Sequence, residues 1–150
     1  IEWMRASASI PVASRPVKLG GKRLLDGGVS DPIPVKWMLS RGYEKNVVVL
    51  TRDVKYRKKA NPKMQLFLKA VLHKYPAFMK DLEERHIHYN ETLEELASLE
   101  KEGRVHIIRP SSPIQAAMIE RDESNLERIY QTGRADMKKD LEKLKAYLDS

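Results

Sequence analysis

The sequence predicts an α/β fold, in which helices alternate with short strands in a layered arrangement. Two runs rich in valine and isoleucine, at 46–51 and 104–109, have the length and composition of buried strands. Around them, apolar residues recur at intervals of three and four, which is the period of an amphipathic helix. With 150 residues, 41% of them hydrophobic, the chain can form one domain or a large part of a bigger one.

The amino-terminal third is expected to form two helices separated by a hairpin. Gly20-Gly21 lies between two short apolar runs, and paired glycines tolerate the positive φ of a tight hairpin turn. Asp26 stands at the end of the returning strand, and Pro34 suits the first turn of the next helix. Trp3 and Trp37 could contact lipid, but packing at helix contacts is the simpler expectation. The expected elements are a helix ending near residue 9, strands at 17–19 and 22–25, and a helix from 34 that stops at Gly42.

The rest of the chain is expected to run strand, helix, helix, strand, helix. The valines of 47–50 suit a sheet that is covered on both faces. Asn61-Pro62 is a typical helix start and Gly103 a typical stop. The apolar stripe from Met137 to Leu148 predicts a last helix that docks on its own sheet. The expected elements are a strand at 46–51, helices at 62–74 and 76–102, a strand at 104–109 and a helix at 124–148.

Composition narrows the class of protein. The net charge is +7, the mean hydropathy is −0.55, and no run approaches the roughly 20 apolar residues that span a bilayer. We therefore expect a cytoplasmic protein whose only membrane contact is peripheral. The chain has no cysteine, which excludes disulfides, thiolate metal sites and cysteine nucleophiles. His86 and His88 are two residues apart on a predicted helix and point to different faces, so we expect neither a metal site nor a cofactor.

The densest basic cluster lies at 52–59 and includes Arg52, Lys55 and Arg57. A solvated surface is the simplest interpretation of such a cluster, and contact with anionic head groups is the functional one. Aromatic residues make up only 7% of the chain and do not alternate with the basic residues, as a base-stacking platform requires. Nucleic acid is therefore not an expected partner.

The tripeptide Asp26-Gly27-Gly28 has two interpretations. In an ordinary turn, the carboxylate accepts backbone N–H bonds. In a catalytic site, the glycines let the backbone bend sharply and leave the carboxylate open, at the sheet edge where α/β enzymes collect their functional groups. The tripeptide alone favours the turn. Asp31 is expected to cap the turn into the helix at Pro34 rather than to form a second catalytic carboxylate.

The residues around this tripeptide resemble the patatin-like phospholipase family. The matching motifs are Ala6-Ser7 with Pro11, then Asp26-Gly27-Gly28, then Ile33-Pro34-Val35, and then the strand Val47–Leu50. Later motifs are similar to the bacterial predicted-esterase branch; they are Leu50-Thr51-Arg52, Tyr56-Arg57-Lys58-Lys59, Ile108-Arg109-Pro110 and Glu120-Arg121-Asp122. The resemblance implies that residues 1–150 are the carboxy-terminal portion of one three-layer α/β/α sandwich with a mostly parallel sheet. The amino-terminal part of the same domain would supply the remaining strands.

The resemblance also implies an activity, the hydrolysis of phospholipids or other carboxylic esters by a Ser–Asp dyad. Asp26 would be the base, supported by Gly27 and Gly28. The serine would lie on a Gly-x-Ser-x-Gly elbow near a glycine-rich oxyanion loop, and this sequence contains neither. We therefore expect the chain alone to be inactive. The alternative is a non-catalytic basic module that binds an anionic surface or a protein partner.

Overall fold

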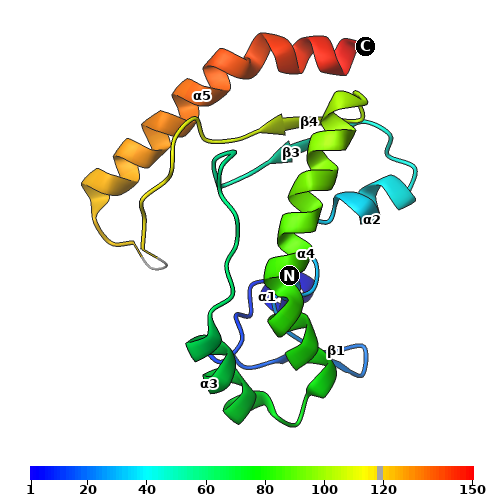
Figure 1. Cartoon of the computed structure of the whole chain (residues 1–150), viewed down its shortest axis with the longest axis vertical. Helices are drawn as coiled ribbons and strands as arrows, with labels where there is room; N and C mark the ends of the chain where they lie inside the picture. Colours follow the sequence, from blue (N-terminus) through cyan, green and yellow to red (C-terminus); the bar gives the residue numbers. More distant parts are fainter. Residues whose placement is uncertain (118–119) are drawn as a thin grey trace. The chain divides into compact units, whose positions relative to one another are not determined.

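The computed structural model describes residues 1–117 and 120–150, which form two compact units. The hairpin unit comprises residues 1–34 and 58–93, and the parallel-strand unit comprises 35–57 and 94–150. Helices and small sheets alternate along the chain, which confirms a mixed α/β fold (Figure 1). The elements are α1 (Glu2–Ser7), β1 (Val17–Leu19), β2 (Lys22–Leu24), the 3₁₀ helix η1 (Gly27–Val29), α2 (Val35–Ser40), β3 (Asn46–Val49), α3 (Pro62–Leu72), α4 (Pro76–Lys101), β4 (Val105–Ile108) and α5 (Glu123–Asp149).

The hairpin unit is organised by the antiparallel pair β1 and β2, in which Val17 is opposite Leu24. Gly20 and Gly21 have φ values of 57° and 72°, as the predicted two-glycine turn requires. The helix α1 packs on β1 and on η1. The buried apolar side chains of this unit are Ala6, Val17, Val29 and Met79.

The parallel-strand unit is organised by β3 and β4, which pair in parallel from Asn46 opposite Val105 to Val49 opposite Ile108. Parallel strands need a long crossover connection, and here the connection contains α3 and α4. Val105 and Ile107 lie two apart on β4 and therefore share one face, where both are buried. Leu96 and Leu99, from the end of α4, are also buried in this unit.

The second face of β3 is open, in contrast to the strand covered on both faces that the sequence predicts. Val47 is 43% exposed and Val49 is 68% exposed.

The prediction that both tryptophans are packed is also wrong, since Trp3 is 68% and Trp37 is 57% exposed. Each tryptophan lies on a six-residue helix that buries a different residue, Ala6 on α1 and Val35 on α2. Instead, the Arg41 guanidinium lies 5.6 Å from the Trp37 ring centroid.

The helix α5 docks on β4, as predicted, but largely through polar contacts. The Tyr147 hydroxyl accepts the Asn46 N–H at 2.8 Å and donates to the Arg104 carbonyl at 2.9 Å. His106 Nε2 and Asp140 Oδ2, which are 2.5 Å apart, form a second link. The predicted apolar stripe is correct only in part: Met137 and Leu144 are half-buried, whereas Leu141 and Leu148 are 38% and 55% exposed.

Candidate active site

Asp26 lies in the hairpin unit, two residues after β2, and begins the 3₁₀ helix η1. Its backbone N–H donates to the Ser9 carbonyl at 2.9 Å, and its Oδ1 accepts the Gly28 N–H at 2.8 Å. The turn predicted from the tripeptide is therefore present, and it fixes one carboxylate oxygen. The side chain is half-buried, and Oδ2 accepts no hydrogen bond from the described residues. One oxygen anchors the carboxylate while the other stays available to a proton donor.

The two glycines after Asp26 differ in what they allow. A Cβ on Gly28 would lie 3.1 Å from Asp26 Oδ1 and 3.7 Å from Arg85 Nη2, whereas a Cβ on Gly27 would meet no atom within 4 Å. The Gly28 carbonyl also accepts a hydrogen bond from Arg85 Nε at 2.7 Å. A side chain at position 28 would therefore crowd the carboxylate, and Arg85 of α4 holds this turn. No sequence signal near Asp26 indicates Arg85.

The segment between α1 and the hairpin supports Asp26 from the other side. Ser9 is 5% exposed, and its hydroxyl donates to the Arg5 carbonyl at 2.7 Å while its own carbonyl accepts the Asp26 N–H. Ala6, one turn earlier, is 3% exposed. The fold thus brings the segment 6–11 and the Asp-Gly-Gly turn together, although they are separated by the whole hairpin.

A cavity of about 260 Å³ lies beside the turn, entirely within the hairpin unit. Asp26 and Gly27 belong to its wall, and most of the remaining wall is apolar or aromatic. The apolar and aromatic lining residues are Pro16, Leu24, Leu25, Leu72, Tyr75 and Phe78. Ligand sites are typically apolar hollows with a few convergent polar groups, which is the composition found here. A carboxylate at such a wall can accept a proton from a hydroxyl group that approaches to about 3 Å.

Two other polar residues near Asp26 do not form a catalytic pair with it. Ser30 also lines the cavity, but its hydroxyl lies 3.5 Å from the Gly27 carbonyl and makes no hydrogen bond to Asp26. Asp31 does not form the predicted cap, because its carboxylate makes no hydrogen bond with the described residues. Only its backbone N–H is engaged, with the Gly27 carbonyl at 2.9 Å. Asp26 is therefore a single carboxylate without a hydroxyl partner among the described residues.

The basic residues predicted to contact head groups lie in the parallel-strand unit, whereas Asp26 lies in the hairpin unit. Arg52, Lys55 and Arg57 are exposed. The Arg52 guanidinium lies 5.1 Å from the Tyr56 ring centroid, and Arg57 Nη1 donates to the Tyr56 carbonyl at 2.8 Å. These contacts order the segment and leave its positive charge at the surface.

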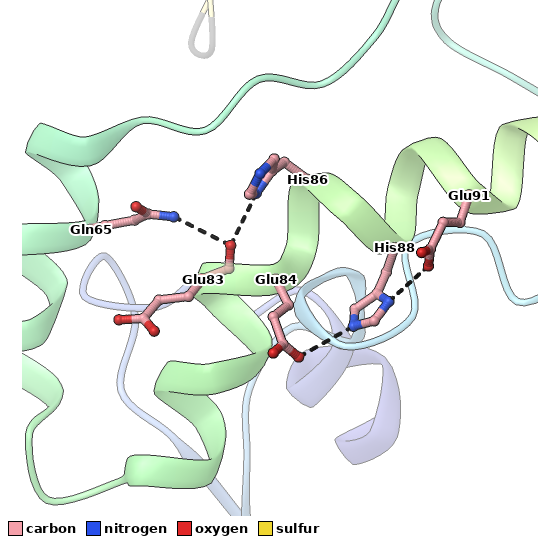
Figure 2. A network of polar contacts seen from close by, with 6 residues as sticks. All are labelled: Gln65, Glu83, Glu84, His86, His88 and Glu91. Carbon is pink, nitrogen blue, oxygen red and sulfur yellow. Dashed lines mark hydrogen bonds and ion pairs between the residues drawn. The ribbon is translucent and has the colours of Figure 1, made fainter.

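The histidines of α4 point in different directions, as their spacing predicts (Figure 2). His86 Nδ1 lies 3.0 Å from the Glu83 carbonyl, while His88 lies between the carboxylates of Glu84 and Glu91, at 3.5 and 3.2 Å. Across the described ranges, no group of three histidine, aspartate or glutamate side chains is arranged to hold a metal ion. The hydrogen bonds and ion pairs in Figure 2 therefore order polar side chains on α4.

The carboxyl groups with displaced pKa values lie in the parallel-strand unit, away from the Asp26 turn along the chain. Hydrogen bonds from Ser111, first of all its backbone N–H at 2.9 Å, lower the pKa of Asp136. The pKa of Asp122 is lowered chiefly by the Ser124 hydroxyl at 2.7 Å, and Asp122 also caps the start of α5. The pKa of Glu120 is lowered first by the Asp122 N–H. These shifts arise from loop and cap hydrogen bonds.

Two family models match the chain. One, described as Patatin-like phospholipase, matches residues 1–39, the span that contains Asp26, Gly27 and Gly28. The other, described as Domain of unknown function (DUF6363), matches residues 75–149, which is half of the chain and contains α4, β4 and α5. No curated protein and no solved structure matches the chain. In the part of the chain that the structure describes, no helix combines the length and apolar character needed to cross a bilayer.

Proposed function

The chain belongs to the family described as Domain of unknown function (DUF6363), and from the patatin-like match over its first 39 residues we propose that it is the carboxy-terminal part of a lipid acyl hydrolase. The observation that supports this most is the setting of Asp26, which lies within the patatin-like span. It lies in a turn held from two sides and lines an apolar cavity. The cavity suits the acyl chain of a carboxylic ester or phospholipid.

In the proposed reaction, Asp26 is the base of a Ser–Asp dyad. A serine from the amino-terminal part of the same domain would approach the unengaged Oδ2 and give up its hydroxyl proton as its oxygen attacks the ester carbon. The alcohol would leave with that proton, and water would then release the acid from the acyl-enzyme by the same transfers. Gly27 and Gly28 would keep the carboxylate accessible, and no cofactor is needed.

The same proposal extends to the fold and to the cellular setting. The uncovered face of β3 suits further strands and helices of a three-layer α/β/α sandwich with a mostly parallel sheet, of the kind found in the bacterial predicted-esterase branch. Arg52, Lys55 and Arg57 would contact anionic head groups from a cytoplasmic protein that associates peripherally with the membrane. Residues 1–150 would be one part of that single domain.

The decisive experiment substitutes Asp26 in the natural full-length protein. Asp26→Asn keeps the shape and the anchoring oxygen but removes the base, so we expect hydrolysis of a p-nitrophenyl ester to fall by about 10²- to 10⁴-fold. Circular dichroism would establish that the fold is kept. Asp31→Asn is the matched control, because Asp31 is an exposed carboxylate five residues away whose side chain makes no hydrogen bond with the described residues. A near-full rate for Asp26→Asn would refute the assignment.

Two further measurements separate this function from that of a non-catalytic basic module. A fluorophosphonate probe should not label the 150-residue chain, because its nucleophile would lie elsewhere in the domain; stoichiometric labelling would contradict the proposal. Charge reversal at Arg52, Lys55 and Arg57 should reduce hydrolysis of vesicle lipid but spare hydrolysis of a water-soluble ester. The basic module predicts instead that charge reversal removes all function and that Asp26 can be replaced freely.

A further inference from the structure

The helix α3 presents an apolar stripe to solvent. Met64, Phe67 and Val71 follow one another at intervals of three and four, and therefore lie along one side of the helix. Their exposed fractions are 49%, 52% and 48%. Leu66 is 72% exposed, and no residue of α3 is buried. Large apolar side chains exposed together on an eleven-residue helix are typical of a surface that binds a partner.

The opposite side of α3 is attached to the hairpin unit, so the exposure of the stripe follows from how the helix is held. Gln65 Nε2 donates to the Glu83 carbonyl of α4 at 3.3 Å (Figure 2), and Lys69 Nζ lies 2.8 Å from Glu83 Oε1. Leu72, also on this side, lines the cavity that Asp26 lines. The helix therefore has one side turned to the candidate site and the other turned to solvent.

Positive charge is concentrated in the part of the sequence that contains α3. Residues 58–74 contain five lysines and no acidic residue. Among the described residues, Lys59, Lys63 and Lys74 form no ion pair, and all three are exposed. The longer span 52–74 contains eight basic residues and one aspartate, so it carries +7, which equals the net charge of the whole chain. The rest of the chain is neutral overall, and the charge of this protein is concentrated at α3 and the segment that leads into it.

We infer that α3 is an interfacial helix that lies in the surface of an anionic bilayer, with Met64, Phe67 and Val71 inserted and the lysines at the head groups. An amphipathic helix with lysines beside large apolar side chains binds in this way, and each lysine near the surface adds attraction to anionic lipid. The inference rests on the proposed function only in taking lipid as the substrate. Since Leu72 of the same helix lines the Asp26 cavity, docking α3 would bring that cavity to its substrate.

The first test places a reporter on the stripe. Because the chain has no cysteine, Phe67→Cys and Val71→Cys can each be labelled at one site with a polarity-sensitive fluorophore. We expect a blue shift, and quenching by brominated lipid, with phosphatidylcholine vesicles that contain phosphatidylglycerol and not with phosphatidylcholine alone. Val49→Cys is the control, because Val49 is also an exposed apolar residue, at 68%, but lies on β3, outside the lysine-rich span. No shift at either stripe position, or an equal shift at Val49, would overturn the inference.

The second test changes the charge without touching the stripe. Lys59→Glu with Lys63→Glu should weaken binding to the anionic vesicles by about thirtyfold or more, since each lysine contributes on the order of 1 kcal/mol. Lys138→Glu with Lys143→Glu makes the same change in net charge on α5 and should weaken binding far less. Equal losses for the two pairs would mean that net charge alone governs binding, and would refute the docking of α3. Vesicle binding needs no hydrolysis, so this inference and the proposed function can fail separately.

Discussion

An exposed apolar surface on β3 in the parallel-strand unit and another on α3 in the hairpin unit differ in the partner that they can accept. On β3, Val47 and Val49 are open to solvent on a strand that pairs only with β4 among the described residues. On α3, Met64, Phe67 and Val71 are open to solvent on a helix whose backbone is bonded internally. Besides its open face, β3 has an edge that is unpaired among the described residues. The backbone groups of such an edge need hydrogen-bonding partners, which another strand supplies and lipid does not. A helix can face lipid directly.

The difference suggests that the two units have different roles in the protein. The hairpin unit contains the candidate base, its cavity and the charged helix, all described within one compact body. The parallel-strand unit contains a two-stranded parallel sheet, an arrangement that is ordinarily covered on both faces. We therefore expect substitutions at the cavity and on α3 in the hairpin unit to change chemistry and lipid binding, and substitutions on β3 and at the contact of α5 with β4 in the parallel-strand unit to change stability.

The largest expected effect tests whether β3 is covered in the natural full-length protein. Val49→Asp would place a charge where further sheet and helices are proposed to pack, and should lower the free energy of unfolding by about 3 kcal/mol or more. Phe67→Asp, on the lipid-facing surface, should change it by less than about 1 kcal/mol. Urea unfolding of both variants measures the contrast. Similar losses would mean that the two surfaces have the same kind of partner.

A second prediction concerns the polar docking of α5 in the parallel-strand unit. Tyr147→Phe removes the hydroxyl that bonds the Asn46 N–H and the Arg104 carbonyl. The Asn46 N–H also donates to the Arg104 carbonyl at 3.1 Å, so neither group is left unpaired, and loss of the hydroxyl bonds should cost about 1 kcal/mol in chemical unfolding of the chain. Tyr130→Phe is the control, since Tyr130 is 57% exposed on the same helix and its hydroxyl bonds no described residue. Equal stability of the two variants would show that the Tyr147 hydroxyl does not hold α5.

A third prediction uses the two glycines that follow Asp26 in the hairpin unit. Gly28→Ala puts a methyl group 3.1 Å from Asp26 Oδ1, so the carboxylate must shift. We expect ester hydrolysis by the natural full-length protein to fall about tenfold, since displacements below an ångström are costly in an aligned site. Gly27→Ala meets no atom within 4 Å and should have the smaller effect. If Gly27→Ala costs as much as Gly28→Ala, the position of the carboxylate does not govern the rate.

The sequence predicts local structure well and surfaces poorly, for a physical reason. The hairpin turn at Gly20-Gly21 and the helix start at Asn61, whose side chain accepts the Met64 N–H at 3.1 Å, depend on neighbouring residues and are confirmed. The sequence does not predict the short helix η1. The hydrogen bond from Arg85 to the Gly28 carbonyl was also missed, because it joins segments that only the tertiary fold brings together.

The burial of apolar residues is also hard to predict from the sequence. The valines of β3 are typical of a strand that is covered on both faces, but their pattern does not indicate whether the covering residues belong to this chain. The cavity beside Asp26 likewise depends on Leu72 and Phe78, which reach it from α3 and α4. Asp26 is predicted from its neighbours in sequence and from a family resemblance. The cavity residues contributed by α3 and α4 are known only from the fold.

The smallest expected effect is the pH dependence of the parallel-strand unit. The Ser111 N–H lowers the pKa of Asp136, so the folded chain holds the charged carboxylate more strongly than the unfolded chain does. This stabilisation is fully present above the ordinary carboxyl pKa and is lost as the pH falls through the lowered one. Asp136→Asn should therefore lower the melting temperature slightly near neutral pH and converge with the unchanged chain in acid. Asp149→Asn, an exposed carboxylate at the end of α5, is the control and should not reproduce that convergence. A constant difference across the acid range would mean that the carboxylate of Asp136 does not stabilise the loop at Ser111.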